Sequence, residues 1–135
     1  MKINHKVVYT SILLLISGCA SKPTVEDSER FSREMIECAH RNLMFGVSFG
    51  VNQITKHAVN NSNSFLKMAT RVTSESFVSK ESPIIKQSVE EDFLEWVQIT
   101  YGSEISLETA WNRYESSCLS KVKPWMDVLI PKKKN

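Results

Sequence analysis

Glycine and proline are scarce in this chain of 135 residues, with only four of each. A β-sandwich needs many turns, and turns use glycine and proline more than most residues. A helix that crosses a bilayer needs about 20 consecutive apolar residues, and the chain has no run of that length. The composition therefore favours helices joined by few turns.

The motifs of common enzyme classes are also missing. There is no G-x-S-x-G elbow, and the segment from Gly46 to Gly50 lacks the Lys-Ser/Thr ending of a phosphate loop. Zinc ligands usually come in closely spaced pairs, and that spacing is absent among the later cysteines and histidines, which are Cys38, Cys118, His40 and His57. We expect no catalysis, no cofactor and no metal.

The N-terminal segment has basic residues but no acidic ones. Lys2 and Lys6 come before a mostly apolar stretch over residues 7–16, and the first acid is Glu26. A basic start followed by a short apolar run is the layout of an export signal. The apolar run ends in Ile-Ser-Gly-Cys at residues 16–19.

This tetrapeptide resembles the lipobox of bacterial lipoproteins, an aliphatic residue and two small residues before a cysteine. The resemblance implies a signal peptide over residues 1–18, cleaved between Gly18 and Cys19, and acyl chains on Cys19. More than one acyl chain anchors a protein stably to a membrane. Residues 19–27 then form a polar tether. Ala20 follows the cysteine where an aspartate favours the inner membrane, so we expect a periplasm-facing protein of the outer membrane in a diderm host, with the inner membrane or the cell surface less favoured.

The net charge of +2 resides in the predicted signal. Cleavage removes Lys2 and Lys6 and no acid, which leaves fifteen basic and fifteen acidic residues. Nucleic-acid binding calls for a basic face, so a nucleic-acid partner is not expected.

If Cys19 is acylated, Cys38 and Cys118 remain as a pair in an oxidising compartment, where disulfides form. We predict that they are bridged, and the alternative is two separate buried thiols.

Apolar residues at helical spacing predict an all-α fold, a bundle of four to five helices over residues 28–123. The bridge would lock its first helix to its last. We expect Thr24 or Ser28 to cap the first helix and residues 60–63 to end the helical region that starts there, as one helix or as two with a break near Gly46. The other predicted helices are a weak one over 65–77, one from Ser82-Pro83 to Gly102, and one from Ser106, with Ile105 packed on Ala110, to Lys123-Pro124.

The C-terminal segment 124–135 is apolar and then basic. Either it folds back to cover the bundle, which we favour, or it contacts a partner or membrane. The residues of this possible contact surface are Trp125, Met126, Leu129, Ile130, Lys132, Lys133 and Lys134.

Other polar motifs favour structural roles. The acidic run of Glu90, Glu91, Asp92 and Glu95 is typical of a solvated helix face. His40 and His57 are expected to be packed or surface residues. The sequon-like segment 60–62 is interpreted as a turn. For Gly46 and Gly50 we prefer a helix break to a close-packing site.

We therefore expect a non-catalytic lipoprotein that is held in the membrane by its lipid anchor and binds another envelope protein or peptidoglycan. Two alternatives remain. One is a pilotin-like escort of secretin subunits, because some pilotins are small helical lipoproteins with a disulfide. The other is an immunity or exclusion protein that blocks a toxin or phage.

Overall fold

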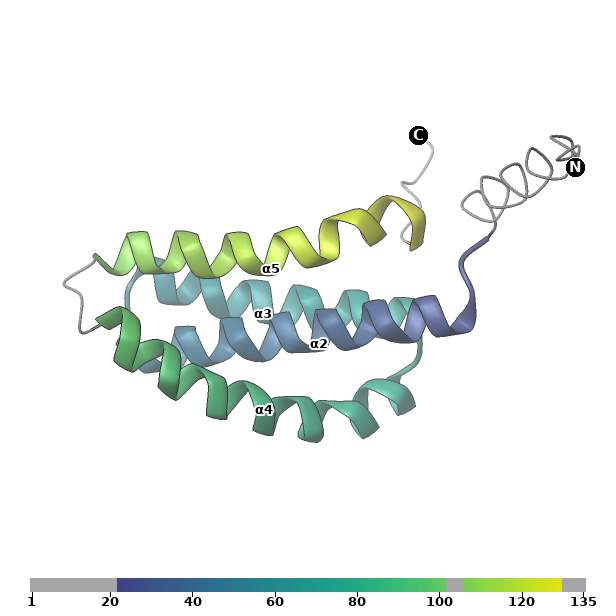
Figure 1. Cartoon of the computed structure of the whole chain (residues 1–135), viewed down its shortest axis with the longest axis horizontal. Coiled ribbons are helices and arrows are strands. Elements are labelled where there is room, and N and C mark those ends of the chain that lie inside the picture. The colour runs from purple at the N-terminus through teal and green to yellow at the C-terminus, as the bar shows by residue number, and fades with distance from the viewer. Residues whose placement is uncertain (1–21, 102–105, 130–135) are drawn as a thin grey trace, which may run out of the picture.

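The computed structural model describes residues 22–101 and 106–129. These residues form four helices and no strand (Figure 1). The predicted all-α fold is thus confirmed, with four helices in the part described. The predicted signal 1–18, Cys19, Gly102 and Ile105 lie outside it. The helices are α2 (Val25–Ser48), α3 (Gln53–Val72), α4 (Glu75–Tyr101) and α5 (Leu107–Leu129).

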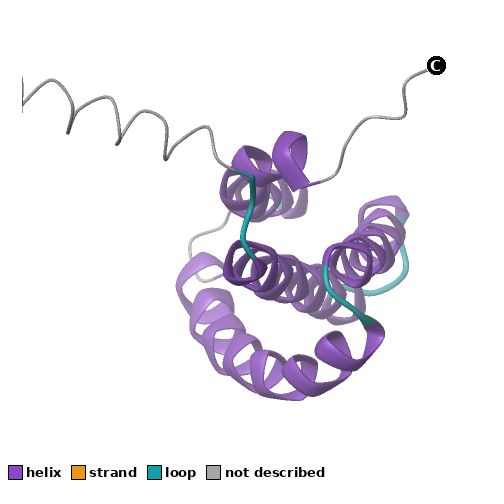
Figure 2. Ribbon diagram, turned by 90° about the vertical axis from the view of Figure 1, so that its right-hand side faces the viewer, coloured by secondary structure: helices purple, strands orange, loops and turns teal. Residues whose placement is uncertain are grey.

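Helix α2 is the centre of the arrangement and contacts each of the other three helices. Seen end-on, α3 lies on one side of α2, while α4 and α5 lie on two other sides (Figure 2). This position explains why buried residues occupy most of the circumference of α2, including polar Ser32 and Asn42.

Two groups of buried side chains form the core. One surrounds the disulfide near the middle of α2 and extends toward its N-terminal end: Phe31, Met35, Ile36, Cys38, Ala39, Phe65, Ala69, Cys118 and Val122. The other is mainly aromatic and lies toward the C-terminal end of α2: Phe45, Ala58, Phe93, Ala110, Trp111 and Tyr114.

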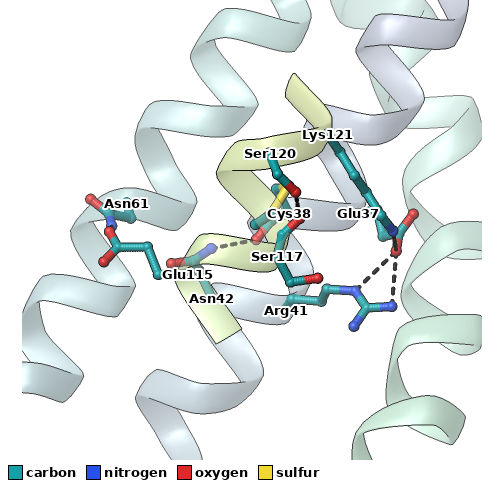
Figure 3. Close-up of a disulfide and its surroundings, with 10 residues drawn as sticks. Glu37, Cys38, Arg41, Asn42, Asn61, Glu115, Ser117, Ser120 and Lys121 are labelled. Carbon is teal, nitrogen blue, oxygen red and sulfur yellow. Dashed lines mark hydrogen bonds and ion pairs between the residues drawn. A yellow bond between two sulfur atoms is a disulfide. The ribbon is translucent and has the colours of Figure 1, made fainter. Parts of the chain in front are cut away.

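The disulfide joins α2 to α5 across 80 residues of sequence, as predicted. Cys38 and Cys118 are both buried, and their Cα atoms are 5.7 Å apart. Figure 3 shows the bridge where α5 crosses over α2. Since the cross-link closes a long loop, it restricts the unfolded chain strongly.

Loss of the disulfide should destabilise the domain. We expect the double variant Cys38→Ala/Cys118→Ala to lose about 2–5 kcal/mol of unfolding free energy, as is typical when a small exported domain loses its bridge. Urea unfolding followed by circular dichroism measures this, and reduced wild-type protein should lose a similar amount. A double variant as stable as oxidised wild type would contradict the assigned role of the bridge.

Two predicted caps are present. The side chain of Thr24 accepts a hydrogen bond from the Asp27 amide, and the Asp27 carboxylate accepts one from the Thr24 amide. This is a capping box. Thr24 is therefore the N-cap of α2, and the alternative candidate, Ser28, lies inside the first turn. The hydroxyl of Ser106 caps α5 by accepting from the Thr109 amide.

The two glycines near residue 48 have different roles. Gly50 lies in the turn between α2 and α3 with φ of 74°, a conformation that suits glycine. Gly46 is inside α2, where an added Cβ would lie 2.7 Å from a Val59 methyl carbon and 3.1 Å from the Thr55 carbonyl oxygen. The predicted break is therefore real but centred on Gly50, and Gly46 is a close-packing site against α3.

Substitution of Gly46 by alanine should weaken the domain. Alanine favours a helix by about 1 kcal/mol over glycine, but overpacking costs about 1–3 kcal/mol. We expect a net loss of about 1 kcal/mol, measured by urea unfolding. If the clash with α3 is the cause, Val59→Ala should cost less in the Gly46→Ala background than in wild type. A Gly46→Ala variant more stable than wild type would show that α2 and α3 approach less closely.

The expected helix end at residues 60–63 is wrong, because α3 runs through them to Val72. Ser62 is buried and continues the inward-facing stripe between Ala58 and Phe65. Asn61 donates to the Glu115 carboxylate of α5 at 3.0 Å. Packing and this contact outweigh the turn preference of the asparagines.

The predicted boundaries at two prolines are also wrong. Pro83 lies inside α4, and Pro124 lies inside α5. Proline has no amide hydrogen, so it cannot donate to the carbonyl four residues earlier. That carbonyl belongs to Ser79 for Pro83 and to Ser120 for Pro124. Both serines and both prolines are exposed, so water can bond to the freed carbonyls. In Figure 1 the ribbon of α4 is bowed, which proline-containing helices commonly are. The actual start of α4 follows Ser74, whose hydroxyl accepts from the Phe77 amide.

Candidate functional site

Helices α4 and α5 flank α2 and approach each other closely only at one end. There the ring centroids of Trp96 and Tyr114 are 4.9 Å apart. Near the middle of α2, a hollow of about 320 Å³ lies between Glu37 and α4. We call this hollow, together with the residues that connect it to α5, the α4–α5 groove. The hollow is lined by Glu37, Ile84, Ile85, Ser88, Val89 and Asp92. The connecting residues beside it are Arg41, Tyr114 and Lys121.

An ion-pair network joins the three helices of the groove. The Glu37 carboxylate of α2 lies 2.9 Å from Arg41 and 3.4 Å from Lys121 of α5. Arg41 also lies 3.6 Å from the Asp92 carboxylate of α4. Figure 3 shows Glu37 and Arg41 pointing from α2 toward α4. Because these side chains are all partly exposed, the pairs contribute little stability and can exchange partners at low cost.

Tyr114 carries a buried polar atom beside this network. Its side chain is 5% exposed, and its hydroxyl makes no hydrogen bond of good geometry with the described residues, although the Arg41 guanidinium lies close enough to interact with it. Burial raises the pKa of Tyr114 far above its usual range, while the nearby positive charge of Arg41 opposes that rise. A buried group without a partner costs about 1–3 kcal/mol. The hydroxyl is therefore a buried donor that Arg41 separates from the surface charges.

Glu34 lies one turn before Glu37. Its Oε2 atom is also buried and has no hydrogen-bond partner among the described residues. Burial raises the pKa of Glu34, and the positive charges of Lys121 and Arg30 partly offset this. The α2 face beneath the groove thus combines unpaired polar atoms with exchangeable charges.

Three arginines of α2 lie over aromatic rings of the neighbouring helices. The guanidinium carbon of Arg41 is 5.9 Å from the Tyr114 ring centroid. The two other stacked pairs are Arg30 with Trp125 at 4.8 Å and Arg33 with Phe77 at 5.2 Å. Such contacts hold an arginine in place while its N–H groups remain able to bind carboxylates.

The histidines have the structural roles expected. His40 is buried, and its Nε2 lies 2.7 Å from the Ser82 hydroxyl. Burial and the nearby Lys86 lower the pKa of His40. His57 is exposed, and its Nε2 lies 3.9 Å from the Glu115 carboxylate.

The acidic run of α4 does not act as one unit. Glu91, Asp92 and Glu95 are exposed, and Glu90 pairs with Lys86 at 3.7 Å. Asp92 alone among them lines the groove hollow. In residues 22–101 and 106–129, no group of three potential metal ligands is close enough to hold a metal ion.

The structure places three residues of the predicted C-terminal contact surface on the bundle. Trp125, Met126 and Leu129 are partly buried against the core around the disulfide. Ile130 and the lysines at 132–134 lie outside the described residues. None of the helices described is long and apolar enough to span a bilayer.

Comparison of the chain with known protein families, with curated protein sequences and with solved structures finds no match.

No sequence motif identifies the site residues Glu37, Arg41, Tyr114 and Lys121. Glu37 and Arg41 are four residues apart, an ordinary surface pair on a helix. Tyr114 lies three residues after Trp111 and four before Cys118, a helical spacing that predicts only a core position. A single sequence does not indicate how α4 and α5 are placed on α2, so it does not reveal the hollow beside Glu37.

Replacement of Tyr114 by phenylalanine tests whether its hydroxyl is unsatisfied. We expect Tyr114→Phe to be at least as stable as wild type and up to about 1 kcal/mol more stable, because a buried donor without a partner is removed. Tyr114→Ala should instead lose about 3–5 kcal/mol, since the aromatic volume is lost. Thermal and urea unfolding measure both. A loss of more than about 1 kcal/mol in Tyr114→Phe would mean that the hydroxyl makes a stabilising bond.

Proposed function

We propose that this chain is a lipid-anchored envelope lipoprotein whose periplasm-facing helical domain binds a segment of another envelope protein in the α4–α5 groove. The lipobox-like residues 16–19 support the anchor, and the groove supports the binding role. The domain acts by binding and not by catalysis.

The observation that carries the binding role is the hydroxyl of Tyr114, which is buried beside Arg41 and makes no hydrogen bond of good geometry with the described residues. A carboxylate from a partner can accept from the partly exposed Arg41 guanidinium and, where Arg41 moves aside, from the tyrosine hydroxyl, which is buried in the free protein. Bonds to ionised groups are stronger than neutral ones, and the gain is larger because the hydroxyl is unsatisfied in the free protein. Arg41 is released at little cost, since its pairs with Glu37 and Asp92 are partly exposed.

The α4 wall supplies the apolar part of the contact. Ile84 is largely exposed, and Ile85 and Val89 line the same hollow. An acidic side chain flanked by apolar ones therefore matches the groove. Peptidoglycan also carries carboxylates, but it lacks large apolar groups, so a protein segment fits better.

Site-specific photo-crosslinking in envelopes tests the proposal. A photoreactive residue at Ser88, in the groove, should capture one discrete partner. The matched control is Ser64, which is exposed on α3. Capture at Ser88 should be lost in Arg41→Glu and strongly reduced in Tyr114→Phe, which keeps its stability. Arg113→Glu, a charge reversal at an exposed position of α5, should leave it unchanged.

The identity of the captured protein separates the alternatives. A secretin would indicate a pilotin-like escort, and a toxin or phage protein would indicate an immunity role. Equal capture at Ser88 and Ser64, or capture insensitive to Arg41→Glu, would show that the groove is not the binding site.

A further inference from the structure

A buried titratable side chain lies under α4, outside the proposed groove. His40 of α2 is 9% exposed, and its Nε2 atom lies 2.7 Å from the hydroxyl of Ser82 on α4. This contact joins the two helices one residue before Pro83, which has no amide hydrogen to donate within α4. His40 therefore holds α4 at a place where the helix lacks one of its own hydrogen bonds.

The first half of α4 is otherwise held by few buried contacts. Among residues 75–88, all of which the structure describes, no side chain is fully buried, whereas Val89 and Phe93 in the second half are buried. Arg33 of α2 pairs with Glu81 at 3.1 Å, but the arginine is 45% exposed. A segment with few buried apolar side chains opens at a low cost in free energy.

The surroundings of His40 disfavour a positive charge. Burial lowers the pKa of His40 below its ordinary value of 6.5, and Lys86 of α4 lowers it further, while Glu90 opposes this. Glu90 is itself paired with Lys86 at 3.7 Å. On α2 the charged neighbours Glu37 and Arg41 pair with each other at 2.9 Å, and no charged group of α3 or α5 in the described part of the chain contributes to the change in this pKa. A protonated His40 therefore favours exposure to water, which requires α4 to move away.

The direction of the pKa change gives the direction of the pH effect. A histidine whose pKa is lowered by packing stabilises the packed state fully above its ordinary pKa of 6.5. This stabilisation is lost as the pH falls through the lowered pKa of the packed state. Acid, and not base, thus weakens the contact between α2 and α4.

We infer that His40 is a pH switch whose protonation in acid releases the first half of α4 from α2 while the second half stays in place. The released segment carries Ile84, Ile85 and Ser88, which line the hollow of the α4–α5 groove. The groove is then intact near neutral pH and dismantled in acid. The switch goes beyond the proposed binding role and does not depend on it, because it follows from contacts within the bundle.

Hydrogen exchange of the full chain in detergent micelles, followed by mass spectrometry, tests the switch. Protection factors are corrected for the intrinsic pH dependence of exchange and compared at about pH 8 and about pH 5, the range over which a histidine changes charge. We expect residues 75–88 to lose protection in acid and α3 to keep it. The loss should be about tenfold for each pH unit between the His40 pKa values of the open and the closed segment.

The variant His40→Gln separates the switch from a general effect of acid, because glutamine does not titrate but can still bond to Ser82. Its protection over residues 75–88 should be the same at both pH values. Lys86→Gln should make the loss smaller, since removal of this charge raises the pKa of His40. The matched control is His57→Gln at an exposed position of α3, which should behave like wild type. Circular dichroism checks that each variant is folded.

Three results would overturn the switch. One is unchanged protection of residues 75–88 in acid, and another is a loss that persists in His40→Gln or, if that variant does not fold, is unaffected by Lys86→Gln. The third is a His40 pKa at or above the ordinary value, measured in the wild type by exchange of the carbon-bound hydrogen of the imidazole ring. None of these results bears on capture of a partner at Ser88, so the switch and the binding role are tested separately.

Discussion

The burial of α2 on most of its sides is the constraint on which the rest of this structure depends. A helix that contacts three others needs small or neutral residues where they approach, which accounts for Gly46 against α3 and the buried Cys38 against α5. It also accounts for buried polar groups that bond within the bundle. The Ser32 hydroxyl, for example, donates to the Ala69 carbonyl of α3. The disulfide then keeps α5 on α2 although the two helices are distant in sequence.

Much of the fold could be predicted from local signals. Helical spacing predicted the fold class. The pairing of the first and last helices was predicted because Cys38 and Cys118 are the two cysteines that remain once Cys19 is assigned to the lipid anchor. The caps at Thr24 and Ser106 were visible because a hydroxyl three residues before a backbone donor is a local feature. The wrong boundaries share one cause. The preferences of asparagine and proline are local too, and at residues 60–63, 83 and 124 tertiary packing or an exposed position overrode them.

The groove could not be predicted in the same way, because it depends on the space left between helices that are distant in sequence. Glu37, Arg41 and Lys121 are ordinary charged residues in the sequence. Only the arrangement of α2, α4 and α5 makes Glu37 line the hollow and places Arg41 and Lys121 beside it. Tyr114 illustrates the difficulty. Its spacing indicates burial, which is correct, but no sequence pattern reveals that its hydroxyl makes no hydrogen bond of good geometry with the described residues. A site built from groups on three helices has no linear motif.

The features proposed to act in binding are those that add least to stability. Among the described residues, the buried Tyr114 hydroxyl makes no hydrogen bond of good geometry, and the charges beside it form partly exposed pairs. A domain of this size has about 5–15 kcal/mol of stability, so such costs are large enough to be noticed, and the long-range disulfide offsets them.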